Sequence, residues 1–308
     1  AAASKVIEAL DDEIERLLAE AHAGVGGRSV APASASKPTV NLFTRAKPAI
    51  ARVQGNYRLT DENAESDTRH IILDFADTHF PVLEGQSIGI VPPGADTNGK
   101  PHQMRLYSVA SPRDGERPNT NNLALTVKRE PQGLCSNYLC DLKKGDTVAV
   151  TGPFGATFLM PDDPTATLLM ICTGTGSAPF RAFTMHRQRT APGAGGHLHL
   201  YFGARTPEEL PYFGPLKRVP ESLMTQRLVF SRVASEPKRY VQDQLRADRD
   251  SLAALIGAPD TYIYVCGLKG MEAGVEAALE DIAAEAGLAW ADLKSRMREE
   301  GRLHVETY

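Results

Sequence analysis

Hydrophobic and polar positions follow three different rhythms along the chain. Over residues 1–21 apolar side chains recur at helical spacing with charged ones between them, which predicts one amphipathic helix. A stretch rich in Gly, Ser, Ala and Pro then runs to residue 38 and is typical of a flexible linker. An isolated helix this short is marginal. We therefore expect residues 1–38 either to pack on the protein itself or to be the remnant of a connection to a further N-terminal module.

Residues 39–161 show short strand-like runs separated by turn residues, with no helical pattern between them. The clearest runs are Arg69–Phe75, Ser87–Val91, Leu123–Val127 and Thr147–Val150. Closely spaced strands without intervening helices predict an antiparallel β-barrel.

From residue 162 onward, strand-like and helical runs alternate. Apolar strands are expected at Thr167–Cys172, His197–Phe202, Arg227–Phe230 and Thr261–Cys266, with helices from about Phe180 and Tyr240 and over Met271–Glu285. This alternation predicts a parallel sheet with helices on both faces. The chain is thus expected to be an all-β domain over 39–161 followed by an α/β domain over 162–308.

Composition narrows the classes of function. A length of 308 residues suits two domains, and 42% hydrophobic with 23% charged residues is ordinary for a globular protein. The net charge of −4 provides no basic field for nucleic acid. No apolar run reaches the ~20 residues of a membrane helix, and the first 20 residues carry six acidic side chains and no apolar signal-peptide core. We expect a cytoplasmic protein without nucleic-acid partners or an integral membrane segment.

The four cysteines follow no metal pattern. Cys135, Cys140, Cys172 and Cys266 have spacings that match neither zinc sites nor clusters. They are expected to be reduced and mostly buried, and no metal site is predicted.

A glycine-containing turn, Thr173–Phe180, follows an apolar strand and opens a helix. Its glycines allow close approach of a phosphate, the free N–H groups of a helix start attract it, and Pro179 is tolerated in the first turn. An ordinary tight turn would look similar, but the strand before it and the helix after it favour phosphate binding.

Two strand ends suggest which dinucleotide binds. An NAD site usually places an acidic residue after the second strand, whereas that strand here ends at Arg205. The third strand ends in Ser231 and Arg232, and Lys238 and Tyr240 follow. A hydroxyl, several cations and an aromatic ring suit a 2′-phosphate and an adenine. A solvated charged loop is the alternative.

A second motif, Arg105-Leu106-Tyr107-Ser108, lies in the barrel region. Strand alternation places Arg105 and Tyr107 on one face, where a cation for a phosphate and a ring for a flat cofactor can converge. A tyrosine in the barrel core is the alternative.

Together and in this order, these motifs closely resemble the plant-type ferredoxin–NADP⁺ reductase family over residues 39–308. Further matching segments are 39–43, 84–89, 98–102, 135–143, 266–272 and 305–308. The resemblance implies an FAD-binding β-barrel followed by a parallel-sheet NADP-binding domain. It also implies that hydride passes from NADPH to FAD, and that single electrons then pass to a ferredoxin or ferredoxin-like iron–sulfur domain.

The resemblance also implies roles for residues. Arg105 would hold an FAD phosphate, Tyr107 would stack on the isoalloxazine, and Tyr308 would cover the other face of the ring. The expected catalytic residues are Ser108, Cys266, Glu306 and Tyr308. Further FAD contacts are expected at Leu106, Val127, Gly133, Leu134, Cys135 and Ser136, and NADP(H) contacts at Lys128, Thr175, Gly176, Ser231, Arg232, Lys238, Tyr240, Gln242 and Gly267.

One departure and several alternatives accompany this interpretation. The segment Lys128–Gly133 is short and has no aromatic residue for the FAD adenine. An acidic ferredoxin would need a basic face, for which the candidates are Arg45, Lys47, Arg52, Lys294, Arg296, Arg298 and Arg302. One alternative is the reductase component of a benzoyl-CoA-type aromatic oxygenase or epoxidase with an upstream ferredoxin module. Others are a diaphorase or flavodoxin reductase, and a non-catalytic flavin- or nucleotide-binding sensor.

Overall fold

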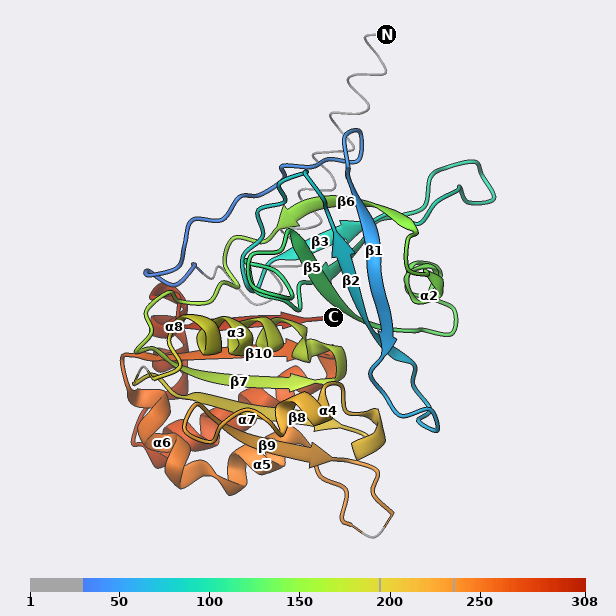
Figure 1. The fold of residues 1–308 in the computed structure, drawn as a ribbon. Coiled ribbons are helices and arrows are strands. Elements are labelled where there is room, and N and C mark those ends of the chain that lie inside the picture. Colours follow the sequence, from blue (N-terminus) through green and yellow to red (C-terminus); the bar gives the residue numbers. More distant parts are fainter. Residues whose placement is uncertain (1–29, 194, 235) are drawn as a thin grey trace.

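The computed structural model describes residues 30–193, 195–234 and 236–308 and places them in two domains (Figure 1). The amphipathic helix expected over 1–21 lies outside the described residues. The described end of the expected linker contacts both domains: Asp163 N–H donates to Ser34 Oγ (3.4 Å), and Ser36 bonds to Asp162 and Arg113.

The first domain is the predicted antiparallel barrel. Its six strands lie in the order β4-β3-β6-β1-β2-β5, and every neighbouring pair is antiparallel. A bridge between Val109 and Leu125 joins the end of β4 to β5 and closes the sheet. The elements are β1 Ala49–Arg58, β2 Thr68–Asp74, β3 Ser87–Ile90, β4 Arg105–Ser108, β5 Asn122–Lys128, α2 Leu134–Asp141 and β6 Thr147–Phe154.

Alternate residues of the barrel strands fill its interior. Ile71, Leu73, Ile88 and Leu125 are fully buried there, and Leu139 of α2 joins the same cluster. The side-chain period of two therefore decides which face of each strand is inward. The expectation that no helix lies between these strands is wrong, because α2 lies between β5 and β6 and packs on the barrel core through Leu139.

The second domain is the predicted parallel sheet, with strand order β11-β10-β7-β8-β9. Its strands are β7 Thr167–Thr173, β8 Leu198–Ala204, β9 Met224–Phe230, β10 Thr261–Gly267 and β11 Leu303–Thr307. Its helices are η1 Gly174–Gly176, α3 Ser177–Thr190, η2 Pro207–Glu209, α4 Phe213–Leu216, α5 Val241–Ala247, α6 Arg249–Gly257, α7 Lys269–Glu285 and α8 Trp290–Glu299.

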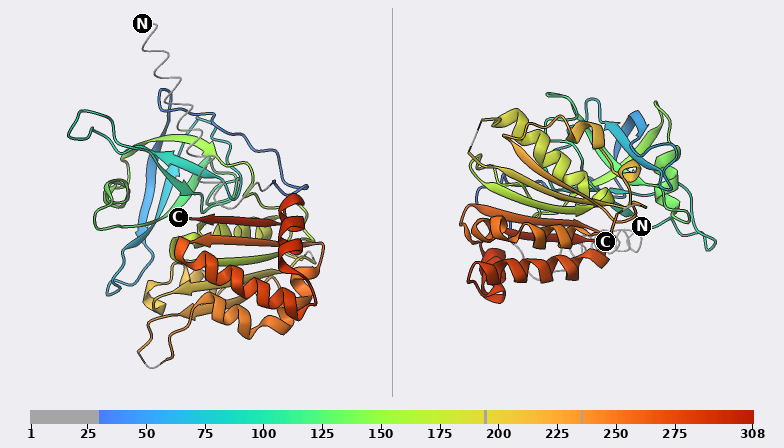
Figure 2. Two further views of the ribbon diagram at one scale, coloured as in Figure 1. Left: turned by 180° about the vertical axis from the view of Figure 1, so that it is seen from behind. Right: turned by 90° about the horizontal axis from the view of Figure 1, so that it is seen from below.

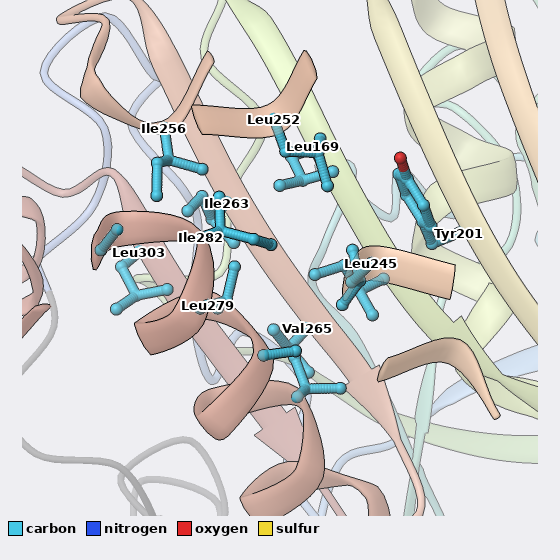
Figure 3. Packing of buried hydrophobic residues seen from close by; sticks show 14 of the residues in the cluster. Leu169, Tyr201, Leu245, Leu252, Ile256, Ile263, Val265, Leu279, Ile282 and Leu303 are labelled. Atoms are coloured by element: carbon cyan, nitrogen blue, oxygen red, sulfur yellow. The ribbon is translucent and has the colours of Figure 1, made fainter. Parts of the chain in front are cut away.

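Helices cover both faces of this sheet (Figures 1 and 2). On one face Leu245, Leu252, Leu279 and Ile282 of α5, α6 and α7 pack on strand residues such as Ile263 (Figure 3). On the other face, α3 packs through Phe180 and Phe183, both buried. The two apolar layers hold the carboxyl ends of the strands at one edge, which is where ligands bind in such sheets. No helix among the described residues is long and apolar enough to cross a membrane.

The N-terminal half of α3 joins the two domains. Ala178 is buried against Ala110 and Ala124 of the barrel domain. One turn later Arg181 donates to the carbonyl of Ala110 (2.7 Å) and pairs with Glu116 (2.5 Å). The turn that opens α3 is therefore held directly against the barrel.

Candidate active site

The segment Arg105–Ser108 forms β4, the first strand in the order of the barrel sheet. The strand hydrogen-bonds to β3, where Ser108 is opposite Ser87. The Arg105 guanidinium is exposed and donates to Gln103 Oε1 (3.2 Å) and Met104 O (3.1 Å). Within the described part of the chain no carboxylate forms an ion pair with Arg105, so its charge is available to a phosphate.

The N-terminal turn of α2 lies beside this strand. Cys135 is buried with its Sγ 3.7 Å from the carbonyl of Ile90, the residue opposite Arg105 in the β3–β4 pair. Tyr107 is half-buried against the same cluster, and burial beside Cys135 raises the pKa of its phenol, so the ring stays neutral. The structure thus brings together the expected FAD contacts of β4 and α2.

Gly133 permits a tight backbone turn at the start of α2. A Cβ at this position would lie 2.4 Å from Ser136 Oγ. The Ser136 hydroxyl accepts from Glu130 N–H (3.1 Å) and donates to Gly133 O (3.1 Å). A larger residue would displace this hydroxyl, so the small backbone and free helix N–H groups fit a pyrophosphate.

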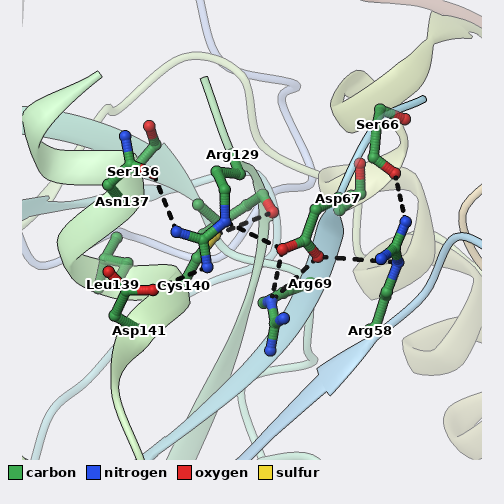
Figure 4. Close-up of polar contacts among 12 residues, drawn as sticks. Arg58, Ser66, Asp67, Arg69, Arg129, Ser136, Asn137, Leu139, Cys140 and Asp141 are labelled. Carbon is green, nitrogen blue, oxygen red and sulfur yellow. Dashed lines mark hydrogen bonds and ion pairs between the residues drawn. The ribbon is translucent and has the colours of Figure 1, made fainter. Parts of the chain in front are cut away.

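An arginine supports the short segment before α2 (Figure 4). Arg129 donates to Asp67 (3.0 Å) and to Asn137 (2.9 Å), and it pairs with Asp141 (2.9 Å). Burial would raise the pKa of Asp67, but hydrogen bonds from Arg129 and Arg69 lower it. This network orders the segment although it lacks an adenine-stacking ring.

Two residues at the end of β5 that were expected to contact a cofactor interact with other parts of the protein. Val127 is 1% exposed, belongs to the barrel core and lies opposite Arg69 in the β2–β5 ladder, where its carbonyl also accepts from Cys140 Sγ. Lys128 is half-buried and pairs with Glu130 (2.8 Å). Leu134, by contrast, is 54% exposed at the start of α2.

Cys172, Cys266 and Glu306 lie side by side at the carboxyl ends of β7, β10 and β11, in direct register. Cys266 is 1% exposed, and burial raises the pKa of its thiol, which therefore stays neutral. Desolvation raises the pKa of the half-buried Glu306 to about 8. All four cysteines are free and buried, as predicted.

Tyr308 continues the β10–β11 ladder beyond this row of residues, and its side chain reaches the turn that follows β7. Its hydroxyl lies 2.6 Å from Thr175 Oγ1, and its N–H donates to Gly267 O (3.0 Å). The side chain is 56% exposed. Gly176 belongs to the same place, since a Cβ there would lie 2.2 Å from Cys266 O. Three of the expected catalytic residues are therefore assembled here, and Ser108 comes from the barrel domain.

A cationic group lies at the ends of β8 and β9. Ser231 N–H donates to Ala204 O (3.1 Å) and Arg232 N–H to Arg205 O (2.8 Å), so the two strand ends remain side by side. The Lys238 ammonium lies 5.2 Å from the centre of the Tyr240 ring.

Two further residues complete the description of this region. Gln242 lies against α7, where a Cβ on Gly274 would come within 2.9 Å of its Nε2. Arg205 was missed as a candidate ligand. The available signal was its position at a strand carboxyl end beside Arg232.

Not all of the basic residues expected to form a docking face are exposed and unpaired in the structure. Arg302 is 5% exposed, donates to Thr261 O (3.0 Å) and pairs with Glu300 (2.6 Å). The prediction for Arg302 is wrong because its guanidinium bonds the backbone at the start of β10. Lys294 pairs with Glu276 on α7.

Fold and site define a class. A closed antiparallel barrel joined to a parallel sheet, with a glycine-containing turn at the carboxyl edge of the sheet, is the architecture of two-domain oxidoreductases that bring a flavin and a nicotinamide nucleotide together. Family models agree: residues 61–158 match the oxidoreductase FAD-binding domain and residues 170–277 the oxidoreductase NAD-binding domain. The chain belongs to the ferredoxin–NADP reductase family, as the following relatives show.

The cyanelle ferredoxin–NADP reductase of Cyanophora paradoxa is 40% identical over 290 residues, which cover 87% of this chain and 79% of the relative. The ferredoxin–NADP reductase of Spirulina sp is 38% identical over 87% of this chain and 98% of its own length. A ferredoxin–NADP⁺ reductase structure from Plasmodium falciparum has a TM-score of 0.71 at 24% identity, covering 88% of this chain and 100% of the other. That last likeness confirms the fold.

Proposed function

We propose that the protein takes electrons from NADPH and delivers them singly to a ferredoxin, with FAD as the resident cofactor. Bound FAD would accept a hydride from NADPH and release the two electrons one at a time. The observation that carries the proposal is the assembly of Thr175, Cys266, Glu306 and Tyr308 at one sheet edge. The relatives named above support ferredoxin as the acceptor.

The chain's own residues perform binding and alignment in this proposal. Arg105 and the N-terminal turn of α2 hold the FAD phosphates, and Tyr107 presents a neutral ring to the flavin. Thr175 and Gly176 receive the nicotinamide nucleotide's pyrophosphate, while the uncharged Cys266 provides a small contact surface at the hydride-transfer point. Tyr308 has to leave Thr175 for a nicotinamide to reach the same place.

The alternative functions considered for this chain have less support. An oxygenase-coupled reductase has no support in the relatives described. A non-catalytic sensor is not favoured, because the chain belongs to an enzyme family and three of its candidate catalytic residues, Cys266, Glu306 and Tyr308, lie at one sheet edge. The cytoplasmic location stays a prediction, since one relative is a cyanelle protein and another, from rice, is chloroplastic.

Absorbance spectroscopy of the purified chain, loaded with FAD, tests the proposal. Anaerobic NADPH should bleach the flavin rapidly and NADH much more slowly, and ferredoxin added afterwards should restore the flavin colour. A protein that binds no FAD, or one that NADPH leaves unbleached, would contradict it.

Glu306 provides a pH test of the same step. Its pKa of about 8 means a neutral carboxyl below that pH and a carboxylate above it. A carboxylate beside the site that receives negative charge opposes hydride uptake. The rate of bleaching by NADPH should therefore fall as pH rises through about 8, and Glu306→Gln should remove the fall. Glu299→Gln, on the exposed face of α8, is the control, and an unchanged profile in Glu306→Gln would exclude this role.

A further inference from the structure

A carboxylate of the barrel domain lies on the cations at the ends of β8 and β9. Glu65 Oε2 is 3.2 Å from Arg205 Nη1 and 3.8 Å from Arg232 Nη1. One carboxylate oxygen therefore lies between two guanidinium groups from neighbouring parallel strands. Glu65 belongs to the loop between β1 and β2, 140 positions before Arg205.

The loop that carries Glu65 is anchored on both sides of this residue. Within the barrel, Arg58 donates to the carbonyls of Ala64 (3.2 Å) and Ser66 (3.3 Å). Toward the other domain, Asp61 N–H donates to Glu208 O (2.9 Å) and Ser66 Oγ to Glu209 (3.2 Å). The backbone around Glu65 is thus held against η2, and its carboxylate is presented to the two arginines.

The side chains of this contact are nevertheless open to solvent. Glu65 is 73% exposed, Arg205 42% and Arg232 58%. An exposed ion pair is weak and exchanges readily. A phosphate monoester brings more negative charge than one carboxylate and offers three acceptor oxygens, so it competes well for paired guanidinium groups.

We propose that Glu65 is an internal competitor for the 2′-phosphate of NADPH, and that Arg205 and Arg232 together form the cation pair for which the two anions compete. The proposal rests on the proposed function, because it assigns a specificity role within the same nucleotide site. Glu65 would lower the affinity for NADPH without affecting a nucleotide that lacks the 2′-phosphate. It would also neutralise one of the two positive charges of the cation pair while no NADPH is bound.

Calorimetric titration with 2′-AMP and 5′-AMP at low ionic strength tests this, since the two probes differ only in the position of the phosphate. Glu65→Gln keeps the side-chain shape and removes its charge. It should tighten 2′-AMP by about two- to fivefold, the size expected for an exposed ion pair, and leave 5′-AMP unchanged. The KM for NADPH should fall by a similar factor. Glu62→Gln, an exposed acid of the same loop, is the control and should change neither.

Arg205→Gln completes the test. It should weaken 2′-AMP, and in its background Glu65→Gln should lose much of its effect, because the two residues act on each other. High salt should shrink all these differences. If the unmodified protein favours 2′-AMP over 5′-AMP but Glu65→Gln does not tighten 2′-AMP, the competitor role is wrong while the proposed function stands. If the unmodified protein shows no preference, the NADPH assignment and the competitor role both fail.

Discussion

The ion pairs between the barrel and the parallel-sheet domain include a buried inner set and an exposed outer set. In the inner set, Glu116 pairs with Arg181 of α3 (2.5 Å) and Glu84 with His186 of α3 (3.1 Å), while His70 supports Glu116 from within the barrel (3.2 Å). These side chains are at most 19% exposed. In the outer set, Glu65 faces Arg205 and Arg232 with side chains 42–73% exposed. Solvent and salt therefore screen the carboxylate–cation attraction weakly in the inner set and strongly in the outer set.

The difference teaches how one interface can both fix geometry and admit a ligand. Burial would raise the pKa of Glu116, but hydrogen bonds from His70 and Arg181 lower it to about 2, so the carboxylate stays charged and paired. Glu84, which is fully buried, behaves alike: burial would raise its pKa, but His186 and Arg113 lower it to about 2. These contacts hold α3, and hence the nucleotide turn before it, against the barrel. The outer pair remains exchangeable.

The largest effect is expected from breaking the inner set. Glu116→Gln leaves Arg181 and His70 facing an uncharged amide in a mostly buried place, and removing one partner of a buried pair costs about 3–5 kcal/mol. The free energy of unfolding in urea should fall by that amount, whereas Glu62→Gln should leave it nearly unchanged. A loss as small as that of a surface mutation would show that the inner pairs do not hold the domains.

The second-largest effect is expected from protonating the carboxylates of the inner set with acid. A carboxyl whose pKa is lowered from 4.5 to about 2 in the folded protein stabilises it above pH 4.5, and this stability is lost as pH falls toward 2. The midpoint of thermal unfolding should therefore drop between pH 4.5 and 2. In Glu84→Gln the drop should be shallower, because one of the two carboxyls no longer titrates. Parallel curves for the two proteins would contradict the assignment.

The smallest effect is expected from the outer set. Glu65→Gln should change the free energy of unfolding by less than about 1 kcal/mol, because exposed ion pairs contribute little. Urea unfolding beside the Glu116→Gln protein gives the direct comparison. A loss approaching that of Glu116→Gln would mean that Glu65 holds the domains together.

Most strands could be predicted because their signals are local. The buried runs at β5, β7, β8 and β10 and the apolar residues at the centre of β2 are visible in a few consecutive residues. β1 was not predicted, since its inward positions include the small residues Ala49 and Ala51, which give a weak apolar signal. β11 was not predicted either, because His304 and Glu306 interrupt its apolar pattern.

In the candidate site, too, the sequence predicted local features, whereas contacts between distant residues depended on the tertiary structure. By itself the sequence determined which side chains follow each strand, so it predicted a phosphate-binding turn at Thr175 and a cationic site around Arg232, and these motifs resembled one family. Only the tertiary structure decided that the Tyr308 hydroxyl meets Thr175, 133 positions away, and that Glu65 meets Arg205, 140 positions away. Periodicity and turn chemistry act over a few residues. The first contact depends on how β7 and β11 come together in one sheet, and the second depends on how two finished domains pack against each other.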